Sequence, residues 1–286
     1  MKTRITFIGL LMAVALWQTA CEKVIDLDVP EGEVQLVVDG WLTDHEDTVQ
    51  YLILTTTAPY FLDQPTPRVS NANVTIHTYE GETLIESTPM PEDPNKPGHY
   101  PFPFPAEVGK GYQVEIDAPP FPPAMSDIQQ VLEVPPILDI FWEEASPDFQ
   151  DSLAIYRVFI STFEFPGPGD FYRWFIFVDG EFQNAPSNIY VQNDLLVDGM
   201  NLPKFSVTST RYRFGERVRI VQSRINENAY NFLSLLRFQT AFIGSPFDTP
   251  PAPLVGNVRF VDSERTALGF FGASATSEAE VVAGVD

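Results

Sequence analysis

The single cysteine of the 286-residue chain, Cys21, has the sequence context that defines its chemistry most closely. It follows a basic start, an apolar run over 5–17 and the small residues Thr19-Ala20. This order is typical of a secretory signal, and the apolar run is too short for a good membrane span. The residues before Cys21 resemble a lipobox, the site at which bacteria acylate a cysteine, although Gln18 stands where leucine is usual.

We therefore predict a signal peptide over 1–20, a lipid on Cys21 and a polar tether over 21–33. Each buried CH₂ group of an acyl chain contributes about 0.8 kcal/mol, so several chains make anchoring effectively permanent. No other stretch reaches about 18 apolar residues. The membrane is thus an expected partner through the lipid anchor alone. The alternative is an ordinary cleaved signal followed by a coincidental cysteine.

Motifs of the common enzyme classes are missing from the sequence. It contains no nucleophile elbow, P-loop, HExxH or dinucleotide-binding glycine pattern. The three histidines, His45, His77 and His99, fall in different expected elements, which does not favour a shared metal site. We predict a protein that is not an enzyme and that has no cofactor and no metal.

Carboxylates gather in three stretches: 44–47, Glu143-Glu144, and Asp148 with Asp151. Loop carboxylates could bind Ca²⁺, which takes six to eight oxygen ligands, but none of these stretches has EF-hand spacing. A pair of carboxylates is also what glycoside hydrolysis requires, at a separation that a sequence cannot show. The default interpretation is that these are solvated loops.

Four aromatic residues are candidates for binding a ligand or a partner: Trp41, Tyr60, Phe61 and Trp142. Tyr60 and Phe61 lie in a proline-flanked loop, which favours their exposure. Most aromatic side chains of β-domains are core residues instead, because alternate residues of a strand face inward. Trp174, within a dense aromatic strand, is expected in the core.

Two tripeptides, 47–49 and 151–153, resemble the O-glycosylation sequon of exported Bacteroidota proteins. They make Thr48 and Ser152 candidate sites of modification. Such a short pattern is common by chance, and the alternative is that both are ordinary strand edges.

Composition favours an all-β fold. The chain has 26 prolines and 23 phenylalanines, which suits short strands joined by proline-rich loops. Its formal net charge of −22 repels phosphate backbones, so we expect no nucleic-acid partner. We predict two β-sandwich-like domains, the second with one accessory α-helix near 226–242.

The first domain is expected over 34–118, where strand-like runs and turn signals match an immunoglobulin-like or transthyretin-like sandwich. A proline-rich connection follows over 119–136. The second domain is expected over 137–275, and its clearest feature is a hairpin of 153–165 with 171–178. Residues 276–286 are expected to be a flexible tail.

Three segments in order, CEKVIDLDVP at 21–30, FYRW at 171–174, and SPFDTPPAPLVGNV with ALGFFGASA within 245–275, resemble one family. It is the Bacteroidota lipoprotein family called domain of unknown function 4249. The resemblance implies an outer-membrane lipoprotein found beside TonB-dependent transporters. It implies no known activity, and no catalytic residue can be carried over.

The leading hypothesis is therefore a non-enzymatic lipoprotein of the outer membrane that binds a TonB-dependent barrel, a ligand for it, or both. The alternative is a carbohydrate-binding or carbohydrate-active surface protein, suggested by the loop aromatics and carboxylates. A purely structural surface protein is a third hypothesis. The sequence does not favour the periplasmic over the cell-surface face.

Overall fold

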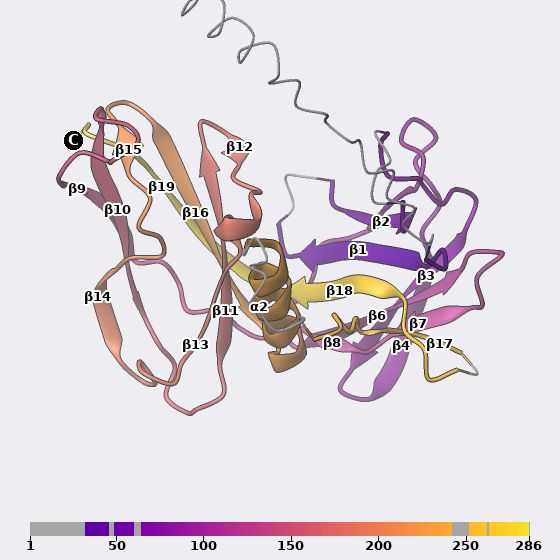
Figure 1. Cartoon of the computed structure of the whole chain (residues 1–286). Helices are drawn as coiled ribbons and strands as arrows, with labels where there is room; N and C mark the ends of the chain where they lie inside the picture. The colour runs from indigo at the N-terminus through magenta and orange to yellow at the C-terminus, as the bar shows by residue number, and fades with distance from the viewer. Residues whose placement is uncertain (1–31, 46–48, 60–63, 242–251, 262, 286) are drawn as a thin grey trace, which may run out of the picture. The chain divides into compact units, whose positions relative to one another are not determined.

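The computed structural model describes residues 32–45, 49–59, 64–241, 252–261 and 263–285. Among them are many short strands, one α-helix and one 3₁₀-helix (Figure 1). Residues from Val34 to Asp286 form one compact unit. The strands make four sheets that enclose two separate cores, which confirms the predicted all-β, sandwich-like fold.

The first sandwich has one sheet in the order β18-β1-β2-β5 and another in the order β17-β7-β6-β3-β4, with β8 beside β6. Alternate side chains of β1, such as Leu36 and Val38, are buried in the core between them. Its strands are β1 (Leu36–Thr43), β2 (Tyr51–Thr56), β3 (Asn73–Glu80), β4 (Thr83–Pro89), β5 (His99–Pro101), β6 (Lys110–Asp117), β7 (Ala124–Ser126), β8 (Gln129–Gln130), β17 (Val258–Phe260) and β18 (Leu268–Ser274).

The second sandwich has one sheet in the order β14-β10-β15, with β9 beside β10, and another in the order β12-β11-β16-β19, with β13 beside β11. Tyr172, Trp174 and Ile176 of β11 are buried in its core, as the alternation predicts. Its strands are β9 (Asp139–Glu144), β10 (Ala154–Phe163), β11 (Phe171–Val178), β12 (Glu181–Phe182), β13 (Tyr190–Asn193), β14 (Asn201–Phe205), β15 (Tyr212–Arg213), β16 (Arg217–Ile225) and β19 (Thr276–Val282).

The predicted helix is α2 (Glu227–Ala241). It begins after Asn226, whose side-chain oxygen accepts a hydrogen bond from the Ala229 amide at 2.8 Å, as an N-cap does. Phe232 and Leu233 of α2 pack with Phe270 of β18 in a third, smaller apolar cluster. The helix contacts both β11 and β18 (Figure 1), so its apolar face is shared by strands of the two sandwiches.

The predicted hairpin of 153–165 with 171–178 is wrong. β10 pairs with β9, β14 and β15, whereas β11 pairs with β12, β13 and β16, and the two strands lie in different sheets. The segment between them crosses from one sheet to the other. Buried side chains hold this segment in place: Asp194 accepts hydrogen bonds from two of its backbone amides, and Arg224 pairs with Asp170.

The predicted domain boundaries also differ from the structure. The proline-rich connection, 119–136, contains β7 and β8, which pair with β6 of the first sandwich. β17 and β18 lie beyond the helix but pair with β7 and β1. The predicted tail over 276–286 is largely β19, which pairs with β16 and is followed by a fully buried Ala283. Alternation of side chains predicts that such segments are strands, but it does not predict which sheet they join.

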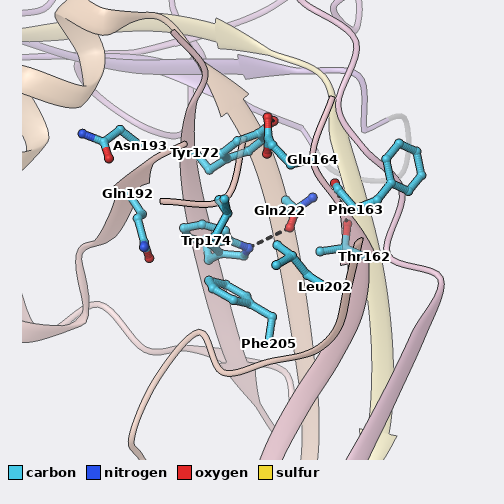
Figure 2. A pocket seen from close by; sticks show the side chains of 11 residues that line it. Thr162, Phe163, Glu164, Tyr172, Trp174, Gln192, Asn193, Leu202, Phe205 and Gln222 are labelled. Atoms are coloured by element: carbon cyan, nitrogen blue, oxygen red, sulfur yellow. Dashed lines mark hydrogen bonds between the residues drawn. The ribbon is translucent and has the colours of Figure 1, made fainter. Parts of the chain in front are cut away.

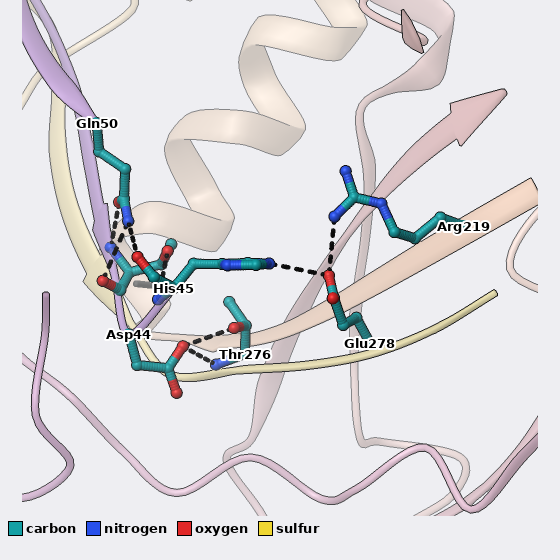
Figure 3. A network of polar contacts seen from close by, with 7 residues as sticks. Asp44, His45, Gln50, Arg219, Thr276 and Glu278 are labelled. Carbon is teal, nitrogen blue, oxygen red and sulfur yellow. Dashed lines mark hydrogen bonds and ion pairs between the residues drawn. The ribbon is translucent and has the colours of Figure 1, made fainter. Parts of the chain in front are cut away.

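A polar network links the end of β1 to β19 (Figure 3). The Asp44 carboxylate accepts hydrogen bonds from the Thr276 amide at 2.9 Å and from its hydroxyl at 2.6 Å. The Glu278 carboxylate lies between His45, at 3.1 Å, and Arg219, at 2.9 Å. The network holds the loop after β1 against the strand that completes the second sandwich.

Among the described residues, no helix is both long enough and apolar enough to cross a membrane.

β18 approaches β1 so closely that one position must be glycine. Gly269 has a φ of +86°, and a Cβ built on it would lie 1.9 Å from the carbonyl oxygen of Val38. Gly180 has the same φ of +86°, but a Cβ there would meet nothing within 4 Å. The two positions therefore differ in contact and not in backbone conformation.

We expect Gly180→Ala to cost about 1–2 kcal/mol, the usual price of a left-handed residue with a side chain. Gly269→Ala should lower the free energy of unfolding by more, because the backbone strands must also separate. Urea unfolding of both variants and the wild type measures the difference. Equal losses at the two positions would contradict the close approach of β18 to β1.

Candidate functional site

A cavity of about 540 Å³ lies between strands of the two sandwiches and α2. This volume is in the range of small-molecule sites, about 300–1,000 Å³. Its walls are mainly apolar and include Phe232 and Leu236 of α2 and Phe270 of β18. Exposed residues near β12, such as Phe182 and Ala185, form part of its rim.

Strand alternation explains which side chains face this cavity. Leu36 and Val38 of β1 belong to the first core, so Val37, Asp39 and Trp41 lie on the opposite face of the strand. On β11, Tyr172 and Trp174 belong to the second core. Arg173 and Phe175 therefore lie on the outer face of that sheet, and both border the cavity.

Trp41, one of the candidate binding residues, is held firmly at this site. Its indole nitrogen donates a hydrogen bond to the Ser274 hydroxyl at 2.9 Å. Its ring stacks on Phe270, with 6.4 Å between centroids. Gly272 lies directly opposite on β18, where a Cβ would come within 2.4 Å of the indole ring. The indole is thus positioned before any ligand arrives.

Arg173 and Asp39 are the only charged residues among the described residues that line the cavity. Part of the Arg173 surface faces the cavity, yet protein surrounds it closely enough that burial lowers the pKa of its guanidinium to about 10. It is therefore still charged at neutral pH. Burial also raises the pKa of Asp39, although Arg173 and Arg68 oppose this rise.

The other predicted site residues do not join Trp41. Trp142 packs against the second core, edge-on to Tyr156 at 5.1 Å between ring centroids, and donates to the Val285 carbonyl oxygen at 3.1 Å. Ser152 is exposed in the turn before β10. Cys21, Thr48, Tyr60 and Phe61 lie outside the described residues.

The acidic stretches mostly meet basic partners. Glu143 pairs with Lys204 at 2.5 Å, and Asp151 pairs with Arg213 at 2.5 Å. Asp148 lies 3.7 Å from Arg211, and Asp44 belongs to the network with Thr276. Glu46 and Asp47 lie outside the described residues. These carboxylates are thus largely neutralised by neighbouring segments.

The three histidines contact different partners and not one another. His77 lies between Ser87 at 2.8 Å and Glu115 at 3.0 Å, and His99 contacts the Pro97 carbonyl oxygen at 3.0 Å. His45 contacts Glu278. Among the described residues, the one group of three potential ligands contains no histidine.

That group is a buried acid cluster, Glu164, Asp170 and Asp194, at the crossing from β10 to β11. Arg224 of β16 forms an ion pair with Asp170. The Asp194 carboxylate accepts hydrogen bonds from the Gly169 amide at 2.7 Å and from the Asp170 amide at 3.0 Å. These bonds hold the segment that the sequence suggested was a hairpin turn.

Glu164 lies at the end of β10 and contacts Tyr172 of β11. Its carboxylate accepts a hydrogen bond from the Tyr172 hydroxyl at 2.8 Å, and the two side chains lie together beside a void of about 20 Å³ (Figure 2). Burial raises the pKa of Glu164 to about 7, and the Asp170 and Asp194 carboxylates add to the rise. Burial likewise raises the pKa of Tyr172 well above its ordinary value.

The acid cluster fits a structural role better than a metal site. One oxygen from each of the three carboxylates lies within 4.8 Å of the others, which is short of the six to eight oxygens that Ca²⁺ takes. Arg224 already supplies positive charge, and Asp194 is engaged by two backbone amides. The cluster secures the crossing between the two sheets of the second sandwich.

Comparison with known proteins identifies the family of this chain. A family model described as domain of unknown function (DUF4249) matches residues 22–280. The chain belongs to this family. The match confirms the family resemblance of the three sequence segments and covers both sandwiches and the cavity between them. No curated protein and no solved structure matches the chain.

Two residues of the cavity, Arg173 and Asp39, were missed by the sequence reasoning. A signal for Arg173 was present: a charged residue within the aromatic run FYRWF, on the face opposite Tyr172 and Trp174. Asp39 interrupts the apolar run of β1 in the same way. From the sequence alone, each of these charged residues looks like part of a strand face exposed to water. The sequence does not show that another sheet lies across from that face.

Glu164 leads to a prediction about stability and pH. Its pKa is higher in the folded chain, about 7, than the ordinary value of 4.5, so the folded state holds its proton more tightly. Stability should therefore fall as the pH rises from about 5 to 8. Glu164→Gln keeps an acceptor for Tyr172 and removes the charge, so it should raise the free energy of unfolding at pH 8 by on the order of 1–3 kcal/mol.

Urea unfolding at pH 5 and pH 8 measures this effect. Glu144→Gln removes an exposed carboxylate and serves as the matched control, which should leave the pH dependence unchanged. If Glu164→Gln and the wild type lose stability equally between pH 5 and 8, the carboxyl is not held protonated in the folded chain.

Proposed function

We propose that this chain is a non-enzymatic, lipid-anchored binding protein of the bacterial outer membrane, which takes a small, largely apolar molecule into the cavity beside α2. The observation that carries the ligand part is the cavity itself, about 540 Å³ with apolar walls and two charged groups. Pockets that bind small molecules combine apolar walls with a few polar anchors in this way.

The anchor part of the proposal rests on the sequence around Cys21 and on family membership over residues 22–280. The family resemblance also suggests the partner, a TonB-dependent barrel to which this protein would deliver its ligand. The non-enzymatic part of the proposal rests on the sequence, which contains none of the common catalytic motifs.

A carbohydrate ligand is the second candidate, and one observation favours it. A polar crevice of about 480 Å³ lies beside β13 and includes Asn188, Tyr190, Gln192 and Thr208. Amide and hydroxyl groups are suited to hydrogen bonding with sugar hydroxyls. No carboxylate is among the described residues that line the crevice, so its geometry favours sugar binding over hydrolysis.

The anchor and the partner can be tested in the native host. We expect tagged wild-type protein in the outer-membrane fraction and Cys21→Ser protein in the soluble fraction, because the variant cannot be acylated. Affinity purification of the wild type from detergent-solubilised outer membranes should recover one barrel in stoichiometric amount. Recovery of the lipoprotein alone would remove the transporter from the proposal, and a membrane-bound Cys21→Ser variant would remove the lipid anchor.

The cavity can be tested with N-phenyl-1-naphthylamine, an uncharged apolar dye that fluoresces on leaving water. We expect saturable binding by the chain produced without residues 1–20 and with Cys21→Ser, which needs no detergent. This chain retains all three apolar clusters. Ala185→Trp, which adds a ring at the cavity rim, should weaken binding at least tenfold.

Ile85→Trp is the matched control, since Ile85 is exposed on β4 and does not line the cavity. It should bind the dye as the wild type does. Absence of saturable binding, or equal binding by all three proteins, would sink the cavity as a ligand site. A glycan array screened with the same three proteins tests the carbohydrate alternative.

A further inference from the structure

Among the described residues, Arg173 is the one cation in the wall of the cavity. No hydrogen bond or ion pair joins the Arg173 guanidinium to another described residue, although the group is charged at neutral pH and is enclosed deeply enough for burial to lower its pKa to about 10. Seven other arginines in the described part of the chain have a carboxylate or another hydrogen-bond acceptor. Arg173 lines the cavity and is only half-buried, so its donors can reach an acceptor that occupies the cavity.

Aromatic rings flank the group without satisfying it. The Arg173 guanidinium carbon lies 4.8 Å from the ring centroid of Trp41 and 4.2 Å from that of Phe175. Such contacts stabilise a cation through the faces of the rings. The five N–H donors of a guanidinium lie in its own plane, so ring contacts leave them available for an acceptor in the cavity.

Asp39 does not fill this role. It attracts Arg173 electrostatically, but no oxygen of its carboxylate comes within the 4.0 Å of an ion pair. Asp39 is more accessible to solvent than Arg173, although enough protein surrounds its carboxyl to raise the pKa. The other described residues of the lining carry no charge. The described walls of the cavity therefore offer one cation without an acceptor among them, two aromatic rings that flank it, and apolar side chains beyond.

We propose that the occupant of the cavity is an amphipathic molecule with one oxyanion, of the carboxylate or sulfonate class, which accepts hydrogen bonds from Arg173. Its apolar body contacts Phe232, Leu236 and Phe270. This inference rests on the proposed function, since it names the ligand class of the same cavity. Two oxygens of a carboxylate or a sulfonate match the paired donors of arginine, and charge-assisted hydrogen bonds are about twice as strong as neutral ones.

Two dyes with the same body test the proposal. 1-Anilinonaphthalene-8-sulfonate is N-phenyl-1-naphthylamine with one added sulfonate, so the ratio of their dissociation constants isolates the anion. We expect the sulfonate to bind the wild type at least tenfold more tightly than the neutral dye, as about 1.5–3 kcal/mol for a bond to a charged group requires. Arg173→Gln should abolish this preference and leave binding of the neutral dye within about threefold.

Two further variants control the result. Arg217→Gln removes an exposed cation of β16 that does not line the cavity, and it should leave the ratio unchanged. Asp39→Asn removes the competing negative charge and should shift the ratio further toward the sulfonate. This variant keeps the inference falsifiable if Arg173→Gln fails to fold, which circular dichroism would show.

The outcomes separate the two proposals. If neither dye binds saturably, the proposed function fails and the anion inference fails with it. If both dyes bind the wild type equally, or if Arg173→Gln weakens both alike, the cavity is a ligand site but its occupant is not selected by an oxyanion. An unchanged or lower preference in Asp39→Asn would overturn the inference in the same way.

Discussion

The parallel pairing of β18 with β1 is the interaction on which the rest of the structure depends. After β17 has returned the chain to the first sandwich, this pairing adds β18 beside β1, along the register from Val37↔Leu268 to Thr43↔Ser274. The lack of a side chain at Gly269 allows the two strands to approach this closely. Directly after β18 the chain enters β19, which pairs with β16 of the second sandwich. One continuous segment, 268–282, therefore completes a sheet in each sandwich and fixes how the two sandwiches meet.

The cavity follows from that arrangement and from the period of two in a β-strand. Each of β1 and β11 buries one set of side chains in its own sandwich and directs the alternate set outward. In an isolated sandwich the outward set would face water. Here the outward sets of both strands face the same space, and α2 supplies a further apolar wall. The candidate site thus belongs to neither core, and neither sandwich alone would contain it.

The local sequence pattern correctly predicted the type of individual strands and of the helix. The strand character of 171–178 and the helix after Asn226 are confirmed, because alternation and an N-cap act within a few residues. The partner of a strand depends on distant residues. The sequence between β10 and β11 looks like a hairpin turn, yet Asp194 and Arg224 hold it as a crossing. Trp41 was a candidate for the site because of its residue type. Arg173 was not, because its place at the cavity depends on β1 lying across from β11.

The charge of Arg173 is the feature that a purely structural interpretation of the cavity leaves unexplained. A side chain that only filled the space between Trp41 and Phe175 would pack as well without charge, since buried ion groups are often replaced by apolar ones with no loss of stability. Cation–π contacts recover part of the desolvation penalty, but the in-plane donors have no acceptor among the described residues. In a chain with a formal net charge of −22, a free anion is repelled at long range. Binding must then come from close contact within the cavity, which favours a ligand whose apolar body adds to the hydrogen bonds of one oxyanion.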